Sequence, residues 1–120
     1  MAERAVPPPD IAPADFFTRW VPAQVAVDPQ RRERLGTTDA ILEFALEGDG
    51  GGVFCLRIEG GEVTGEEGEA RHPDLRVRLD VTTWRRLNSG ELTAPEAFLR
   101  RRVHLKGNLA LAIKLHLILG

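Results

Sequence analysis

The stretch LRVRLDVTTWRRL, from Leu75 to Leu87, changes its hydrophobic period halfway along. Apolar and charged residues alternate from Leu75 to Val81, which predicts a strand with one covered face and one solvated face. Trp84 and Leu87 then lie one helical turn apart, which predicts a helix. A strand that leads directly into a helix indicates a mixed domain of strands and helices.

The residues before this stretch also alternate with a period of two, which predicts further strands. ILEFALE (41–47) and VFCLRI (53–58) flank the flexible turn GDGGG (48–52) and read as a β-hairpin. Gly60 and Gly61 form a second turn before a weaker strand around EVTGEEGEA (62–70). The side chains expected on the covered face are Leu42, Phe44, Leu46, Phe54, Leu56 and Ile58.

The chain opens with a proline-rich segment, which we predict to be an extended arm over residues 1–14. Asp15 is positioned to cap a helix that begins FFTRWVPAQVAV. In that helix Phe16, Trp20 and Val27 fall near one face. Pro22 lies within the same segment and is expected to kink or end the helix.

After Leu87, the residues NSG (88–90) stop the helix, and a new one opens at Thr93, whose spacing from Glu96 is that of a capping box. RVHLK (102–106) predicts a fifth strand with Val103 and Leu105 inward. Asn108 then caps a final helix in which nine of the eleven residues 109–119 are apolar. A helix that is apolar nearly all round must be covered on nearly every side. A sheet with one covered face leaves little protein to cover it, so a bound lipid is expected to help.

Catalytic groups are hard to assemble from this sequence. Ser89 is the only serine and lies in a helix stop, and Cys55 alternates with inward-facing residues as an inert strand thiol would. The three histidines lack the spacing of metal ligands, and the glutamate pairs lie among glycines in a predicted turn. We therefore expect no enzyme activity, no metal and no cofactor.

The charges divide along the chain, although the formal net charge is only −2. Residues 1–80 carry 16 acids and 9 bases, whereas residues 81–120 carry 2 acids and 7 bases. The basic cluster formed by Arg100, Arg101, Arg102 and Lys106 is either an ordinary solvated surface or a rim that meets anionic headgroups at a membrane. The net charge argues against a nucleic-acid partner.

Length and cysteine content fit a single domain in a reducing compartment. At 120 residues the chain has room for one domain, which we place at 15–120, after the arm. A single cysteine and an opening without a signal peptide favour a cytoplasmic protein. The apolar C-terminal run is shorter than the about 20 residues that cross a bilayer.

The stretch LNSGELTAPEAFLRRRVHLKGNLALAIKL (87–115) resembles the sterol carrier protein 2 (SCP2) family. Three motifs carry the resemblance: a helix ending in glycine followed by a Pro-x-Ala-Phe segment, a strand closing in Gly-Asn, and an apolar Leu-Ala-x-Lys-Leu helix. The matching positions are Gly90, Pro95, Ala97, Phe98, Val103, Leu105, Gly107, Asn108, Leu111, Ala112, Lys114 and Leu115. The chain lacks the Ser-Lys-Leu-type ending of peroxisomal proteins.

The resemblance implies an α/β (α+β) fold, with a five-stranded, mostly antiparallel sheet and helices over one face that enclose an apolar tunnel. It further implies non-enzymatic binding or transport of a fatty acid, fatty acyl-CoA, sterol-like or isoprenoid lipid. The expected lining residues are Phe54, Leu56, Trp84, Leu87, Phe98, Leu99, Leu109, Ile113 and Leu117. Two alternatives stay open: a module that presents a hydrophobic substrate to a partner enzyme, as in quinone biosynthesis, and a module whose last helix contacts another protein. The oligomeric state is not fixed by the sequence.

Overall fold

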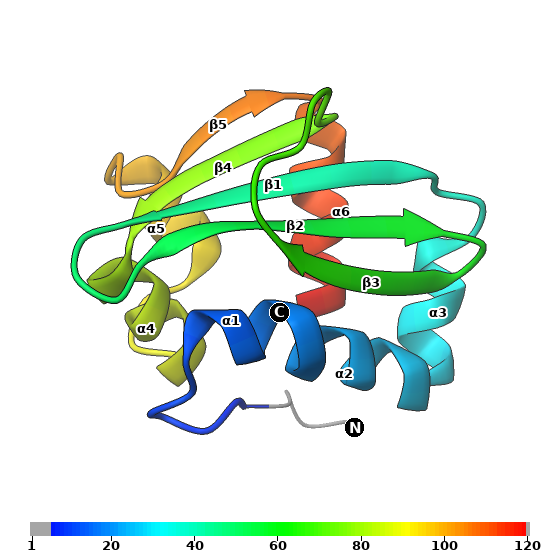
Figure 1. Ribbon diagram of the computed structural model, residues 1–120, viewed down its shortest axis with the longest axis horizontal. Helices are drawn as coiled ribbons and strands as arrows, with labels where there is room; N and C mark the ends of the chain where they lie inside the picture. Colours follow the sequence, from blue (N-terminus) through cyan, green and yellow to red (C-terminus); the bar gives the residue numbers. More distant parts are fainter. Residues whose placement is uncertain (1–5, 120) are drawn as a thin grey trace.

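In the computed structural model, which describes residues 6–119 and the side chains of residues 6–116, five strands form one sheet (Figure 1). The strand order is β3-β2-β1-β4-β5. β1 pairs antiparallel with β2 and parallel with β4, and the other pairs are antiparallel. The strands are β1 Ala40–Glu47, β2 Gly52–Glu59, β3 Glu62–Glu67, β4 Leu75–Asp80 and β5 His104–Gly107. The predicted fold class and all five predicted strands are confirmed.

The helices come in two groups along the chain, before β1 and after β4. They are α1 Pro13–Asp15, the π-helix η1 Phe16–Trp20, α2 Val21–Val27, α3 Pro29–Leu35, α4 Val81–Ser89, α5 Ala94–Leu99 and α6 Leu109–Leu119. Figure 1 shows α6 crossing behind the sheet, while the connection from β3 to β4 crosses in front of it. Within residues 6–119 the helices therefore cover one face, and this connection lies over the other.

The first helical segment differs from its prediction at four points. It begins at Pro13, inside the predicted arm, and Asp15 makes no capping hydrogen bond but lies 4.0 Å from Arg19. Pro22 does not end the helical segment, which continues as α2. η1 precedes the proline, and in it the Val21 N–H donates to the Phe16 carbonyl, five residues back. This wider turn makes room for the proline ring. Val27, expected on the inner face, is 74% exposed.

The same segment packs closely on the sheet because β3 contains a glycine where it passes. Any Cβ atom at Gly65 would collide with the backbone carbonyl of Phe17 in η1. With no side chain at this position, the η1 backbone lies directly against β3. Phe17 can then reach the middle of the sheet, where its ring centroid is 4.8 Å from that of Phe44 and 5.1 Å from that of Phe54.

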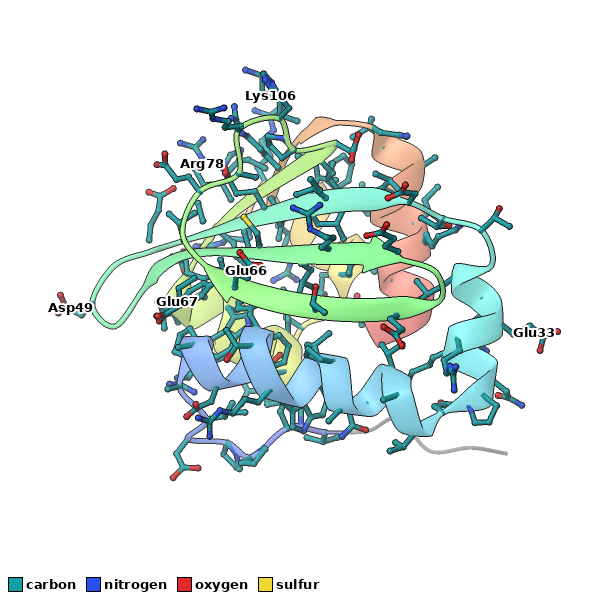
Figure 2. All side chains as sticks on the ribbon, turned by 45° about the vertical axis from the view of Figure 1, so that its right-hand side comes forward. Glu33, Asp49, Glu66, Glu67, Arg78 and Lys106 are labelled. Atoms are coloured by element: carbon teal, nitrogen blue, oxygen red, sulfur yellow. The ribbon has the colours of Figure 1, made fainter. Side chains whose placement is uncertain are left out.

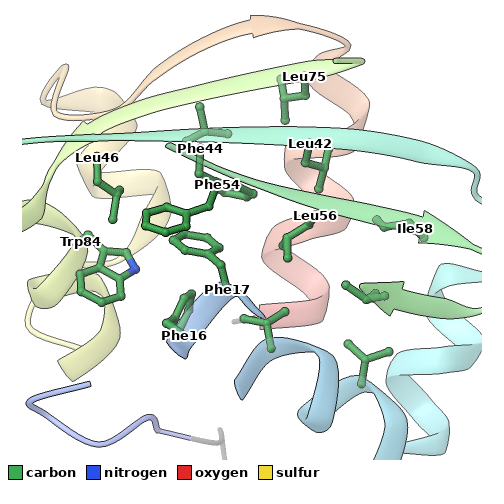
Figure 3. Packing of buried hydrophobic residues seen from close by; sticks show 14 of the residues in the cluster. Phe16, Phe17, Leu42, Phe44, Leu46, Phe54, Leu56, Ile58, Leu75 and Trp84 are labelled. Atoms are coloured by element: carbon green, nitrogen blue, oxygen red, sulfur yellow. The ribbon is translucent and has the colours of Figure 1, made fainter. Parts of the chain in front are cut away.

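The hydrophobic core lies between the sheet and the helices (Figure 3). The six inward side chains predicted for β1 and β2 are all buried, as are Leu75, Val77 and Leu79 of β4. Val81, which the alternation places in the strand, instead begins α4, because the Asp80 carboxylate accepts a hydrogen bond from the Thr83 N–H and caps the helix. The helix caps predicted at Thr93 and Asn108 are confirmed.

The other sheet face is partly covered by the 68–74 connection. Glu43, which is 8% exposed, accepts a hydrogen bond from the Ala70 N–H at 2.9 Å and pairs with Arg76 at 3.2 Å. Asp74 accepts from the Ile41 N–H at 2.8 Å. One carboxylate at each end thus holds the connection against β1, and this allows β4 to pair parallel to that strand.

Candidate functional site

The candidate site lies where α4, α5 and α6 meet the inner face of the sheet. Its floor is formed by Phe54, Leu56 and Trp84, which are each 4% exposed or less and belong to one core cluster. The Trp84 ring lies edge-on to Phe16, with centroids 5.3 Å apart. Leu87, one turn further along α4, is half-buried and packs against the same cluster.

Four other residues predicted to line a tunnel lie at the surface in this structure. Phe98 and Leu99 of α5 are 52% and 80% exposed, and Leu109 and Ile113 of α6 are 54% and 67% exposed. These exposed fractions place the four side chains in contact with solvent. The side chain of Leu117 lies outside the described residues. Their part in lipid binding stays a prediction.

The last helix is covered on one side only. Leu111, Ala112 and Leu115 pack against the core, whereas Leu109 and Ile113 point away from it. The polar exception Lys114 donates a hydrogen bond to the Thr38 hydroxyl, just before β1. The expectation that this helix needs a cover on nearly every side is thus met by the protein on only one face. The other face leaves large apolar side chains in contact with solvent.

A buried hydrogen-bond donor in the floor has no partner. The indole nitrogen of Trp84 is inaccessible to solvent and makes no hydrogen bond among the described residues. Figure 3 shows this nitrogen turned toward the rings of Phe17 and Phe54, inside the core. A buried, unsatisfied donor costs about 1–3 kcal/mol, so an acceptor brought to it by a ligand would relieve that cost. Sequence reasoning missed this feature, because residue type alone does not show which way an indole turns.

Two of the concave pockets of the structure lie outside this site. One, of about 340 Å³, lies under the 68–74 connection and includes Cys55 and His72. The other, of about 550 Å³, lies between the N-terminal segment and α4. There Arg85 donates to the carbonyls of Pro9 and Ile11, both at 3.0 Å, which holds the predicted arm against the domain.

Cys55 and Ser89 each donate a hydrogen bond to a nearby backbone carbonyl. Burial, reinforced by Glu43 and Glu66, raises the pKa of the Cys55 thiol, which therefore stays protonated. Its Sγ lies 3.1 Å from the Gly68 carbonyl, to which it donates. Ser89 donates to the Arg86 carbonyl at the end of α4. Within the described part of the chain no three His, Cys, Asp or Glu side chains could together hold a metal ion, and no helix is long and apolar enough to cross a membrane.

The basic residues singled out in the sequence are all exposed. Arg100, Arg101 and Arg102 form the turn that follows α5, and Lys106 lies on β5. Arg100 pairs with Glu96 at 3.3 Å. Figure 2 shows Lys106 at the top of the molecule, with Arg78 between it and Glu66 and Glu67 of β3.

Comparison with known proteins supplies the family. Hydroxysteroid dehydrogenase-like protein 2 of Mus musculus is 32% identical over 94 residues, which are 77% of this chain and 19% of that protein. The chain thus spans about a fifth of the length of this curated relative.

Two solved structures share the fold over most of their own length. The solution structure of palmitated SCP2L2 from Aedes aegypti matches 83% of this chain and 87% of its own, with a TM-score of 0.65 and 21% identity. A crystal structure of sterol carrier protein 2 matches 87% of this chain and 91% of its own, with a TM-score of 0.66 and 23% identity. The profile of the SCP-2 sterol transfer family matches residues 21–120. The chain therefore belongs to this family, whose domains generally bind or transfer lipids.

Proposed function

We propose that this domain binds a single lipid and carries it without changing it chemically. The ligand is a fatty acid, a fatty acyl-CoA, or a sterol-like or isoprenoid lipid. The observation that carries the proposal is that large apolar side chains of α5 and α6 remain exposed, among them Phe98, Leu109 and Ile113. Exposed patches of this kind on a folded domain mark binding sites for apolar ligands or partners.

The ligand would lie along α5 and α6, with the floor beneath it. Phe98, Leu109 and Ile113 would be covered on binding, and each fully covered side chain contributes roughly 1.5–3 kcal/mol. Phe54, Leu56, Trp84 and Leu87 would contact the part of the ligand that reaches inward. The partly exposed or half-buried residues of this set lie on helices and can therefore move without opening the sheet: Leu87, Phe98, Leu109 and Ile113.

The unpartnered indole of Trp84 favours ligands that carry an oxygen acceptor. A carboxylate, an ester carbonyl or a sterol hydroxyl would accept from its N–H, whereas a plain hydrocarbon would leave the donor unsatisfied. The palmitate of the Aedes aegypti structure carries such an oxygen acceptor, its carboxylate. This supports acyl lipids as the first ligands to test.

The test is a titration of delipidated protein with a fluorescent long-chain fatty acid. We expect saturable binding at one site with a micromolar dissociation constant, a free energy of about 8 kcal/mol, and recovery of the ligand unchanged. Ile113→Ala should weaken binding about tenfold, because it removes apolar area that the ligand covers. Val27→Ala is the matched control, since Val27 is equally exposed but lies on α2. Absence of saturation, or equal losses in both variants, would refute the proposed site.

A second candidate function is presentation of a hydrophobic substrate to an enzyme. The Mus musculus relative favours this candidate, because the part that matches this chain is only about a fifth of a much longer protein named as a dehydrogenase. In that case the same lipid site would serve a catalytic partner instead of a membrane or a second carrier. Capture of a lipid-modifying enzyme by the lipid-loaded protein, with none captured by the Ile113→Ala variant, would favour this candidate.

A further inference from the structure

The turn after α5 uses an arginine in a conformation that normally belongs to glycine. The Arg101 N–H donates to the Phe98 carbonyl at 3.0 Å, and the Arg102 N–H donates to the Ala97 carbonyl at 2.8 Å. These two hydrogen bonds define a Schellman motif, whose left-handed position is occupied here by Arg101 with φ 57°. Arg101 is the one non-glycine residue with a positive φ in the described part of the chain.

The end of α4 allows a comparison within the same protein, because there a glycine occupies the left-handed position. Gly90 follows α4 with φ 84° and closes its last turn. An L-residue in the left-handed region is less stable than glycine by roughly 1–2 kcal/mol. A residue kept at such a cost indicates a use for its side chain, and Arg101 is fully at the surface.

The surroundings of Arg101 combine unpaired positive charge with an exposed apolar tip. Neither Arg101 nor Arg102 forms an ion pair among the described residues, although Arg102 attracts the Asp80 carboxylate from further away. Leu99, two positions before Arg101, is 80% exposed, more than any other large apolar side chain whose exposure is described. The turn therefore presents cations around a protruding leucine.

A second arrangement that opposes stability lies on the paired strands β4 and β5. The register of β4 and β5 places Arg76 directly opposite Lys106. Like charges at opposed positions of an antiparallel pair are destabilising. Figure 2 shows Lys106 at the top of the molecule, with Arg78 below it, between Lys106 and the labelled glutamates of β3. Arg76 and Arg78 are paired with Glu43 and Glu47, whereas Lys106 forms no ion pair among the described residues. Lys106 thus joins Arg101 and Arg102 as a cation without an ion pair.

We propose that the turn Leu99–Arg102 docks this protein onto a bilayer that carries anionic lipids. Arg101 and Arg102 would bind headgroup phosphates, and Leu99 would enter the boundary between headgroups and acyl chains. A bilayer fits better than a protein partner, because it offers a broad negative surface with an apolar layer directly beneath it. These cations without an ion pair would turn this side of the molecule toward the membrane.

The experiment measures co-sedimentation of the full chain with vesicles of phosphatidylcholine alone and with vesicles containing equal parts phosphatidylglycerol. We expect binding to the second kind only, weakening as salt is raised. Arg101→Gln should reduce the partition coefficient about fivefold, and Arg101→Lys should retain it. Arg32→Gln removes the same charge from exposed α3, at the opposite end from α5 in Figure 1, and should leave the partition coefficient unchanged.

The strain at Arg101 gives a second readout that a merely structural residue would not show. Arg101→Gly should raise the thermal unfolding midpoint by about 2–4 °C, since it relieves the left-handed arginine, while it weakens vesicle binding as much as Arg101→Gln. Leu99→Ser should also weaken binding to the anionic vesicles, without lowering the midpoint.

Several outcomes would overturn the inference. These are equal binding to both vesicle types, an Arg101→Gly variant that binds as the parent does, or full displacement by inorganic phosphate matched to the lipid phosphate. Binding to an acidic protein but not to anionic vesicles would assign the turn to a protein partner instead. A parent chain that binds the fatty acid in solution but neither vesicle would refute docking and leave the proposed lipid site intact.

Discussion

Asp80 is the last residue of β4, and its carboxylate caps the first turn of α4. Its oxygen accepts from the Thr83 N–H at 2.6 Å, so α4 begins immediately after β4. The backbone hydrogen bond from Thr83 is the main cause that lowers the pKa of Asp80; burial opposes it, and the Thr83 hydroxyl and the charge of Arg102 lower the pKa further. This junction orients α4 and with it Trp84, one turn further along.

Removal of this cap should therefore cost stability in a pH-dependent way. We expect Asp80→Ala to lower the free energy of unfolding by about 1 kcal/mol at neutral pH. Because the folded-state pKa is depressed, the contribution is fully present above the unfolded value of about 3.9 and is lost as pH falls through the lower folded value. Urea melts of both proteins at neutral and acid pH would measure this.

The conservative variant separates charge from hydrogen bonding at this position. Asp80→Asn also caps helices, so it should retain most of the stability at neutral pH while it removes the pH dependence. A difference between Asp80→Ala and the parent that stays constant down to acid pH would contradict this account.

At the scale of elements, α6 is divided between core and surface. One face packs on the sheet through Leu111, Ala112 and Leu115, and the opposite face exposes Leu109 and Ile113. A stability experiment can therefore distinguish the two faces of one helix, free of differences in helix propensity between elements.

We expect Leu115→Ala to lower the free energy of unfolding of the ligand-free protein by about 2 kcal/mol, because it leaves a void against the core. Ile113→Ala should cost less than about 1 kcal/mol, because few protein contacts are lost at an exposed position. Denaturant melts with and without fatty acid would measure both. For Ile113→Ala the main loss should appear as a smaller stabilisation by the ligand. Equal costs in the two variants would indicate that Ile113 is ordinary core.

Local patterns predicted those elements that have a local cause. The strands were predictable because Leu42, Phe44 and Leu46 alternate with residues that face the other side of the sheet, and the last helix because Asn108 precedes a run of leucine and alanine. α3 was missed because PQRRERL has no apolar period, and within it only Arg31 and Leu35 are buried. The unbroken helix through Pro22 was unpredictable, since it depends on hydrogen bonds at a turn wider than the α-helical one.

The candidate site was predictable in composition more than in arrangement. Seven aromatic side chains and an apolar helix indicated an apolar site, and the floor residues Phe54, Leu56 and Trp84 are indeed brought together. The exposure of the other four residues could not be predicted, because it depends on how far α5 and α6 stand from the sheet. These residues are Phe98, Leu99, Leu109 and Ile113. No sequence period encodes that spacing.

At the scale of the whole molecule, the strand order converts the division of charge along the chain into a division in space. β3, with Glu62, Glu66 and Glu67, forms one edge of the sheet, and β5, with Lys106, forms the other. The insertion of β4 beside β1 creates this order, because it places the basic C-terminal third at the edge opposite β3.

Replacement of Lys106, on the basic edge of the sheet, should increase the free energy of unfolding. Lys106→Glu replaces a like charge opposite Arg76 with an attractive one, and we expect a gain of about 0.2–1 kcal/mol that fades at high salt. Lys106→Gln should give about half of that gain. Urea melts at low and high salt would measure the effect. A loss of stability in Lys106→Glu at low salt would contradict the like-charge interpretation.

The π turn at η1 also determines which chain lengths this fold accepts. With its hydrogen bond spanning five residues, η1 holds one residue more than an α-helical turn. Deletion of any one residue between Phe16 and Trp20 would tighten the turn and bring the ring of Pro22 back against a carbonyl. Elsewhere in a helix end or loop a lost residue is readily absorbed. Here the proline that follows makes the number of residues in η1 a constraint on which deletions the fold accepts.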